Sequence, residues 1–164
     1  MTIVPGYGTD AIHLGQTSSV LRSVLGPPTR RRKSGSLREY WVYSDLNFEA
    51  IVSQKTGRLL SLFFHLGSPL AGGRLLGLTE EAVYRKFTAP SRRVKGFPLT
   101  DDQYLDSYLA YDAGISFFIG KSGKVKTVVV SSPKRKYVAS KQKPKHVDRR
   151  SHGMNLPVAA MQLR

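Results

Sequence analysis

The chain has 164 residues, 40% hydrophobic and 10% aromatic, which is enough apolar material for one ordinary domain or for two small units that share a core. It contains no cysteine, which excludes disulfides and thiolate metal sites, and it has no apolar run of the roughly 18 residues that span a bilayer. The formal net charge is +15, and more than half of this excess lies in residues 132–164. The sequence therefore divides into a moderately basic body and a strongly basic tail.

The N-terminal segment lacks the features of an exported protein. Residues 1–8 contain neither a basic region nor an apolar run, and no lipobox cysteine follows them. This predicts a cytoplasmic location. Pro5, Gly6 and Gly8 favour turns, so residues 1–13 are interpreted as an entry segment with a short strand or an extended arm.

One stretch of the sequence occurs twice. Residues 14–33 align without a gap with residues 76–95, at a constant offset of 62 positions. Such recurrence predicts two copies of one structural unit. The identical pairs include Leu14 and Leu76, Gly15 and Gly77, Thr17 and Thr79, Pro28 and Pro90, Arg30 and Arg92, Arg31 and Arg93, and Lys33 and Lys95.

Each copy predicts a helix that begins after a threonine. The hydroxyl of Thr17 can accept a hydrogen bond from a free amide of the first turn, and Gly26 can take the positive φ that ends the helix. Thr79 has the same role in the second copy. The side chains expected to be buried are Val20, Leu21, Val24 and Leu25 in the first helix and Ala82, Val83 and Phe87 in the second.

Three runs with strand-like composition follow each predicted helix. They are rich in aromatic and β-branched residues or alternate apolar with polar residues, and Gly57 and Gly123 stand where a hairpin loop needs a left-handed residue. The runs are residues 40–43, 48–53 and 59–66 in the first unit, and 108–111, 115–119 and 125–131 in the second.

The predicted fold is therefore α+β, with two α-β-β-β repeats whose helices pack on one face of an antiparallel sheet and leave the other face to a partner. The tail has too little apolar material to fold alone, and we expect it to be disordered. The predicted parts are repeat 1 (1–66), a Gly/Pro linker (67–73), repeat 2 (74–132) and the basic tail (133–164).

These repeats resemble small α+β domains of the BamE/SmpA-OmlA type, and as a tandem pair they resemble the β-lactamase inhibitor protein architecture. The resemblance covers roughly residues 10–131 and implies non-catalytic binding, either as a scaffold in outer-membrane assembly or as an inhibitor that holds an enzyme on a concave sheet. It is carried by the helix entry (Leu14, Gly15, Thr17, Leu21; Leu76, Gly77, Thr79, Val83), the helix exit (Leu25, Gly26, Pro28) and the Tyr-x-x-Tyr of the next strand.

Aromatic and cationic side chains at equivalent places are the candidate binding residues. Tyr and Trp beside Arg have the composition of a protein interface, although strand alternation sends about half of the aromatic rings into the core. The predicted partner-binding residues are Trp41, Tyr43, Tyr108, Tyr111, Arg31 and Arg93.

The basic clusters after each helix, residues 30–33 and 92–95, and those of the tail are candidate anion sites. Cations after a helix can equally offset the helix dipole or protect a strand edge, so this alternative stays open. The predicted anion-binding residues are Arg30, Arg92, Lys134, Arg135, Lys136, Lys143, Lys145, Arg149 and Arg150.

Enzymatic chemistry finds little support in the sequence. It contains no P-loop, no complete dinucleotide loop and no nucleophile elbow, and Asp101, Asp102 and Asp106 have no neighbouring histidine. His13 and His146 lack further ligands at a usual metal spacing. We therefore predict no catalytic residue, no cofactor and no metal.

The sequence favours a non-catalytic protein-binding or inhibitor-like module that recognises an acidic partner through its sheet face and its cationic tail. The alternative is a nucleic-acid-associated protein that binds phosphates without sequence specificity through the tail. No membrane span is predicted, and the oligomeric state is left open.

Overall fold

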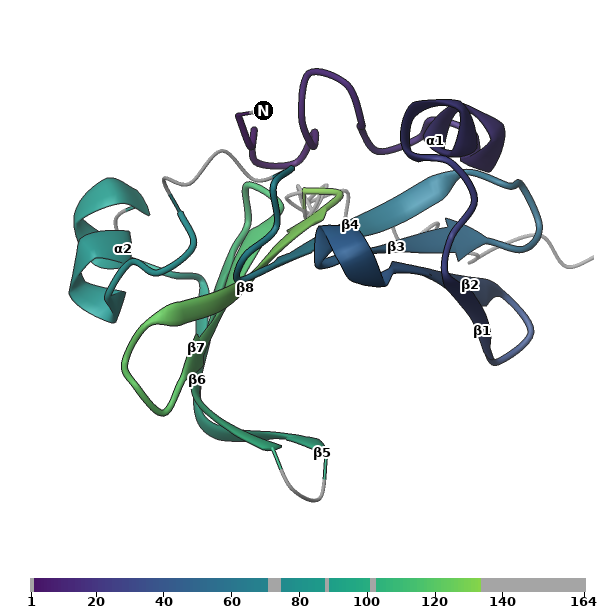
Figure 1. Ribbon diagram of the computed structural model, residues 1–164. Coiled ribbons are helices and arrows are strands. Elements are labelled where there is room, and N and C mark those ends of the chain that lie inside the picture. The colour runs from purple at the N-terminus through teal and green to yellow at the C-terminus, as the bar shows by residue number, and fades with distance from the viewer. Residues whose placement is uncertain (1, 71–74, 88, 101–102, 134–164) are drawn as a thin grey trace, which may run out of the picture.

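The computed structural model describes residues 2–70, 75–87, 89–100 and 103–133. An N-terminal segment of turns leads into two short helices and a set of strands (Figure 1). The elements are α1 (Ser18–Leu25), β1 (Arg30–Ser34), β2 (Arg38–Tyr43), the 3-10 turn η1 (Ser44–Leu46), β3 (Phe48–Ser53), β4 (Leu59–His65), α2 (Glu80–Phe87), β5 (Arg92–Thr100), β6 (Gln103–Tyr111), β7 (Ile115–Gly120) and β8 (Val125–Ser131).

All eight strands form one antiparallel sheet with the order β1-β2-β3-β4-β8-β7-β6-β5. Strands β1–β4, here called the first half, pair as consecutive neighbours, and so do β5–β8, the second half. The two halves join where β4 pairs with β8. Figure 1 shows the sheet bent into an arch, with both helices and the N-terminal segment on its outer side and an open concave side beneath.

The predicted fold of two α-β-β-β repeats with helices packed on a sheet is wrong. The described part of the chain is mostly one eight-stranded sheet with only two short helices. The prediction missed β1 and β5, which begin at Arg30 and Arg92, because all five residues of β1 are exposed and its sequence has no apolar alternation. An edge strand is held by backbone bonds on one side and does not need an apolar face.

Helix α1 forms where the sequence predicts it but covers little of the sheet. Leu21 is fully buried, whereas Val20 and Val24, which were expected in the core, are 39% and 45% exposed. Gly26 ends the helix at φ +78°, as expected, and its amide donates to the Arg22 carbonyl at 2.8 Å. Thr17 stands at the N-cap, but its hydroxyl bonds the Ser19 hydroxyl instead of a helix amide.

Helix α2 follows the predicted pattern more closely. The Thr79 hydroxyl accepts a hydrogen bond from the Ala82 amide at 3.3 Å, which confirms Thr79 as the cap. Val83 is fully buried, while Ala82 and Phe87 are half-buried. Like α1, this helix therefore places one fully buried side chain against the sheet.

The two predicted hairpin glycines are confirmed. Gly57 and Gly123 have φ values of +64° and +70°, which favour glycine. Isolated bridges pair Thr17 with Arg58 and Thr79 with Lys124, so the start of each helix is tied to the hairpin of its own half. These backbone contacts hold both helices on the same side of the sheet (Figure 1).

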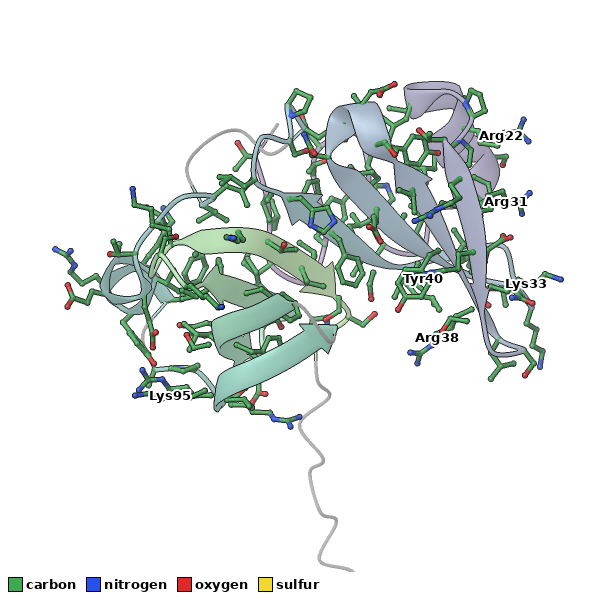
Figure 2. The ribbon with its side chains drawn as sticks, turned by 60° about the horizontal axis from the view of Figure 1, so that its bottom comes forward. Arg22, Arg31, Lys33, Arg38, Tyr40 and Lys95 are labelled. Atoms are coloured by element: carbon green, nitrogen blue, oxygen red, sulfur yellow. The ribbon has the colours of Figure 1, made fainter. Side chains whose placement is uncertain are left out.

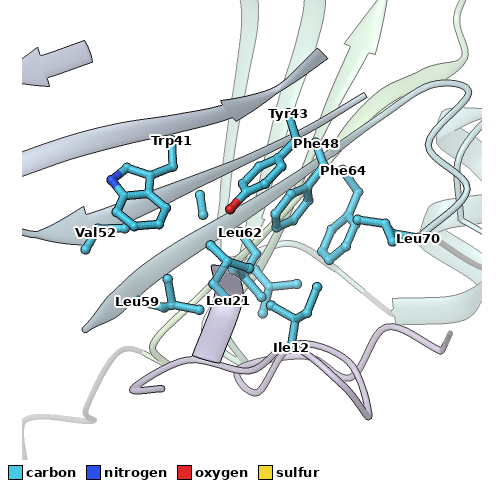
Figure 3. Packing of buried hydrophobic residues seen from close by; sticks show 12 residues of the cluster. Ile12, Leu21, Trp41, Tyr43, Phe48, Val52, Leu59, Leu62, Phe64 and Leu70 are labelled. Carbon is cyan, nitrogen blue, oxygen red and sulfur yellow. The ribbon is translucent and has the colours of Figure 1, made fainter. Parts of the chain in front are cut away.

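The core lies between the helix side of the sheet, the helices and the N-terminal segment. Figure 3 shows Leu21 from α1 and Ile12 from the N-terminal segment facing Trp41, Tyr43 and Phe64 of the strands. A second cluster in the other half contains Val83, Leu109 and Phe117 among others. Val130 of β8 belongs to the first cluster, so apolar packing crosses the join between the halves.

The predicted linker, residues 67–73, is described as far as Leu70, and nearly all of the predicted tail, residues 133–164, lies outside the described residues. Gly67 to Leu70 and Pro133 are their described parts, and Leu70 is buried against the first cluster. The boundaries of the predicted parts stay a prediction.

Candidate partner-binding surface

The concave face of the sheet carries a cross-strand row that begins and ends with an arginine. The pairings place Arg30 and Arg92 at the two ends, because side chains at paired positions point to the same face. The side chains between them are mainly apolar at the centre of the row, and those next to Arg92 are small. Its members, from β1 to β5, are Arg30, Val42, Glu49, Phe63, Val129, Ser116, Ala110 and Arg92.

Partly exposed aromatic rings lie in this row or beside it on both halves. The ring centroids of Tyr40 and Phe63 lie 6.4 Å apart, and those of Tyr108 and Phe118 lie 4.8 Å apart. All four rings are half-buried, and the apolar residues Ile51 and Val129 of the same face are buried. The concave face is therefore largely apolar at its centre without a covering element among the described residues.

Cations rim the first-half end of the concave face. The guanidinium carbon of Arg32 lies 4.9 Å from the centre of the Tyr40 ring, within the range of a cation–π contact. Arg38 pairs with Ser53 and Ser34, so its side chain shares this face. Figure 2 shows Arg38 and Tyr40 of β2 together on the side turned toward the concavity. This end of the face is thus both aromatic and positively charged.

One carboxylate lies within the row, at Glu49. Its Oε1 atom is 3.6 Å from Nε2 of His65, just beyond hydrogen-bond distance, and the two groups attract electrostatically. The His65 imidazole lowers the pKa of Glu49 against the opposing effect of burial, and Arg32 and Arg30 lower it further. A shallow hollow of about 240 Å³ next to this pair is lined by Val42, Tyr43, Ser44, Asn47, Phe48, Glu49 and His65.

Three of the predicted partner-binding residues lie in the core. Trp41, Tyr43 and Tyr111 are 4%, 3% and 9% exposed and face the helix side, so they offer almost no surface to a partner. Burial raises the pKa values of the Tyr43 and Tyr111 hydroxyls to about 12. These residues contribute to folding, because they pack under the helices.

The predicted arginines Arg31 and Arg93 also face the helix side, and each is paired with a glutamate. Arg31 lies 2.6 Å from Glu39 and over the Trp41 ring, and it lowers the pKa of Glu39. Arg93 lies 2.6 Å from Glu80 of α2. Their charges are therefore partly neutralised within the fold.

Tyr108 lies on the concave face, where the sequence placed a binding residue. Its hydroxyl donates to the Ser116 hydroxyl at 3.2 Å. Arg30 and Arg92, predicted as anion sites, are exposed at opposite ends of the same face. The other predicted anion sites, Lys134, Arg135, Lys136, Lys143, Lys145, Arg149 and Arg150, lie outside the described residues.

Sequence reasoning missed Phe63 and Phe118 as surface residues. Each stands next in sequence to a buried aromatic or apolar residue, so strand alternation alone shows that one of each pair faces away from the core. Composition gives no sign of which one. In the part of the chain that the structure describes, no group of three or more His, Asp or Glu side chains is placed to hold a metal ion, and no helix is long and apolar enough to cross a membrane.

Comparison with known proteins shows similarity of fold only. No protein-family model and no curated protein matches the chain. The structure is similar to a cysteine-rich secretory protein from Staphylococcus aureus, with a TM-score of 0.50, 19% identity, and coverage of 78% of this chain and 48% of that one. It is also similar to an extracellular protein containing a SCP domain from Bacillus anthracis, with a TM-score of 0.50, 16% identity, and coverage of 73% and 44%.

A third structure, of a DUF4309 family protein from Bacillus subtilis, matches with a TM-score of 0.52 and 16% identity, covering 77% of this chain and 88% of that one. The chain spans less than half the length of the first two proteins. These neighbours are compatible with a non-catalytic binding module.

Two expectations from the sequence are corrected by these neighbours. The resemblance to BamE/SmpA-OmlA domains and to the β-lactamase inhibitor protein architecture is wrong, since the matching folds are of other kinds and the chain is mostly sheet. The short helix-entry pattern that carried the resemblance is a capped helix tied to a hairpin, which many folds can use. The predicted cytoplasmic location is contradicted, because two neighbours are described as secretory or extracellular.

Proposed function

We propose that the chain is a non-catalytic binding module that holds an acidic partner protein on the concave face of its sheet. The observation that carries this proposal is the row that runs from Arg30 to Arg92. It presents apolar surface at its centre and a cation at each end, and the half-buried rings of Tyr40 and Tyr108 lie beside it. Apolar centres with charged rims are the usual arrangement of protein interfaces.

The charge of the face supports an acidic partner. Arg30, Arg32 and Arg38 lie at one end and Arg92 at the other, all exposed, while Glu49, the carboxylate of the row, is half-buried beside His65. Complementary charges at the rim speed association and select partners. The extracellular descriptions of two structural neighbours support a role outside the cell. The inhibitor-like role applies if the partner is an enzyme. An assay of the captured enzyme with and without the chain tests this role, because an inhibitor lowers the activity and a simple binding module does not.

Capture of the partner followed by charge reversal tests the proposal. The partner is captured from culture medium and cell-surface extract with the full chain and identified by mass spectrometry, and its affinity for variants is measured by calorimetry. Arg30→Glu with Arg92→Glu should weaken binding about tenfold or more. The matched control is Lys55→Glu with Lys121→Glu, which changes two exposed cations in hairpin turns and should leave the affinity nearly unchanged.

Replacing the aromatic rings with alanine measures the contribution of the apolar centre separately from that of the cationic rim. Phe63→Ala and Phe118→Ala remove half-buried rings from the centre of the face and should each cost about 1–2 kcal/mol of binding free energy. Circular dichroism and thermal unfolding verify that both variants are folded. Equal affinity of the arginine and lysine charge reversals, or full affinity in the ring variants, would refute the concave face as the binding surface.

A further inference from the structure

Strand β1 forms one edge of the sheet. Among the described residues, the strand order gives it β2 as a neighbour on one side and no strand on the other. All five of its residues are exposed, and its pairing with β2 is regular from Arg30 to Ser34. The outer side of such a strand presents backbone N–H and C=O groups in the spacing that an added strand requires.

Four successive residues of β1, from Arg30 to Lys33, are cations. Alternation directs Arg30 and Arg32 to the concave face and Arg31 and Lys33 to the helix side, so the edge is positive on both faces. Like charges at directly opposite positions destabilise strand pairs, whereas opposite charges stabilise them. The edge therefore disfavours pairing with a second copy of itself and favours an acidic strand.

A hollow lies next to this edge on the helix side. Its volume is about 190 Å³, and two arginines line it, Arg22 from the last turn of α1 and Arg31 from β1. Figure 2 shows Arg22, Arg31 and Lys33 along the outer edge of β1. The full lining is Arg22, Pro27, Pro28, Arg31 and Trp41.

The two arginines of the hollow differ in the contacts that they make within the fold. Arg31 is held by Glu39 at 2.6 Å and stacks over the Trp41 ring at 4.9 Å, so it is fixed in place and partly neutralised. Arg22 is exposed and lies close enough to Tyr43 to lower the pKa of that hydroxyl slightly against the effect of burial. Together with the rigid walls of Pro27 and Pro28, this arrangement suits the carboxylate of a short acidic side chain.

We infer that β1 binds an extended acidic segment of a partner protein as an added strand, with one acidic side chain of that segment in the hollow of Arg22 and Arg31. Backbone bonds along the edge supply affinity, and the cations on both faces supply the preference for acidic sequences. This edge shares Arg30 and Arg32 with the concave face proposed above, but Arg22, Arg31 and Lys33 belong to the edge alone and Phe63 and Phe118 to the concave face alone. Variants of these unshared residues let either proposal fail in experiment while the other holds.

The competing explanation is that the cations only keep the exposed edge from aggregating. The two explanations differ in what they require of the ligand backbone. Protection of the edge predicts no binding of extended peptides, and plain charge attraction predicts binding that does not depend on backbone N–H groups. Strand addition requires those groups.

The test uses the full chain and a fluorescently labelled short peptide that alternates glutamate with threonine. Binding is followed by fluorescence anisotropy at physiological salt. A second peptide of the same sequence carries N-methyl groups at alternate backbone positions on the side that would bond β1, and a third has lysine in place of glutamate. We expect the first peptide to bind, the N-methylated peptide to lose about tenfold or more in affinity, and the lysine peptide not to bind.

Substitutions locate the site. Lys33→Glu should weaken the glutamate peptide several-fold, while Lys55→Glu, on a hairpin turn, should not. Arg22→Ala tests the role of the hollow and should weaken binding of the glutamate peptide. Its control is Arg85→Ala, which removes an exposed arginine from the last turn of α2 and should leave the affinity unchanged. Absence of binding up to millimolar peptide, equal affinity for the N-methylated peptide, or equal effects of Lys33→Glu and Lys55→Glu would each overturn the inference. Unchanged affinity in Arg22→Ala would overturn the role of the hollow.

Discussion

His65 of β4 and Thr127 of β8 bond each other across the join between the two halves of the sheet, with Nδ1 of the imidazole 3.0 Å from Oγ1 of the hydroxyl. The second imidazole nitrogen, Nε2, is buried and faces Glu49 at 3.6 Å. A polar chain thus runs from Thr127 through His65 to Glu49 on the concave face, beside the apolar pair of Phe63 and Val129. Its electrostatic balance depends on the charge of Glu49.

Replacing Glu49 should change the acid sensitivity of the fold. Its pKa in the folded chain is lowered chiefly by His65, so its contribution to stability is present above the ordinary glutamate pKa of about 4.3 and is lost as the pH falls through the lower folded value. Glu49→Gln should therefore reduce the free energy of unfolding at neutral pH by about 1 kcal/mol or less and should flatten its fall between about pH 5 and 3. Urea unfolding at a series of pH values measures both effects.

The control for this experiment is Glu81→Gln, which changes an exposed glutamate in the first turn of α2. It should leave the slope of stability against pH close to that of the parent chain. Parallel pH profiles for the parent chain and Glu49→Gln would show that the Glu49 and His65 pair contributes nothing to stability.

Truncation of Leu21 should show how much α1 contributes to the fold. Leu21 is the one fully buried residue of α1 and packs in the first core cluster. Leu21→Ala should cost about 2–4 kcal/mol of unfolding free energy, because it leaves a cavity under the helix. Val24→Ala, at a position that is 45% exposed, should cost less than about 0.5 kcal/mol, apart from small propensity effects. Similar losses in the two variants would mean that the helix does not pack as described.

Alanine variants of two glycines with left-handed φ values should distinguish the cost of backbone strain from the cost of a steric clash. A Cβ at Gly114 (φ +83°) would collide with the Ser131 carbonyl and approach Gly6, whereas a Cβ at Gly35 (φ +64°) would meet nothing within 4 Å. Gly35→Ala should cost only the left-handed strain of about 1–2 kcal/mol. Gly114→Ala should cost clearly more, and chemical denaturation compares the two. Equal costs would argue against the close contact between the β6–β7 turn and the end of β8.

The nucleic-acid alternative rests on the composition of residues 134–164 and stays a prediction. Titration of DNA and RNA against the full chain and against a truncation that ends at Ser132, at two salt concentrations, tests it. If the alternative is right, the full chain binds with a steep loss of affinity on adding salt, and the truncation does not bind. Equal binding by both forms would assign the contact to the sheet instead, and no binding at moderate salt would remove the alternative.

The sequence predicts the local features of this fold well. The start of each helix, the end of α1 at Gly26, the hairpin glycines Gly57 and Gly123, and the six predicted apolar strands depend on neighbouring residues, so their patterns can be read directly. Strand β1 could not be predicted in this way, because its five exposed residues have no apolar period. Strand β5 was also missed, and it too begins with two arginines.

Which aromatic ring of a strand faces the core was beyond prediction. Tyr40 and Trp41 are adjacent, so they point to opposite faces, and either choice fits the sequence. Trp41 is buried because it shares a core cluster with Leu21 of α1 and Ile12 of the N-terminal segment, and this depends on distant parts of the chain. The row from Arg30 to Arg92 also depends on the pairing of β4 with β8, which no local pattern shows.

The pairing of β4 with β8 also has a consequence for folding kinetics. Every other neighbour in the sheet is the next strand along the chain, so each half can grow by successive local hairpins. The central pair instead joins residues such as His65 and Thr127, which are 62 positions apart. Since a long loop must close before that pair gains its bonds, we expect the docking of the two halves to limit the refolding rate. The central ladder of the sheet is then the last to form.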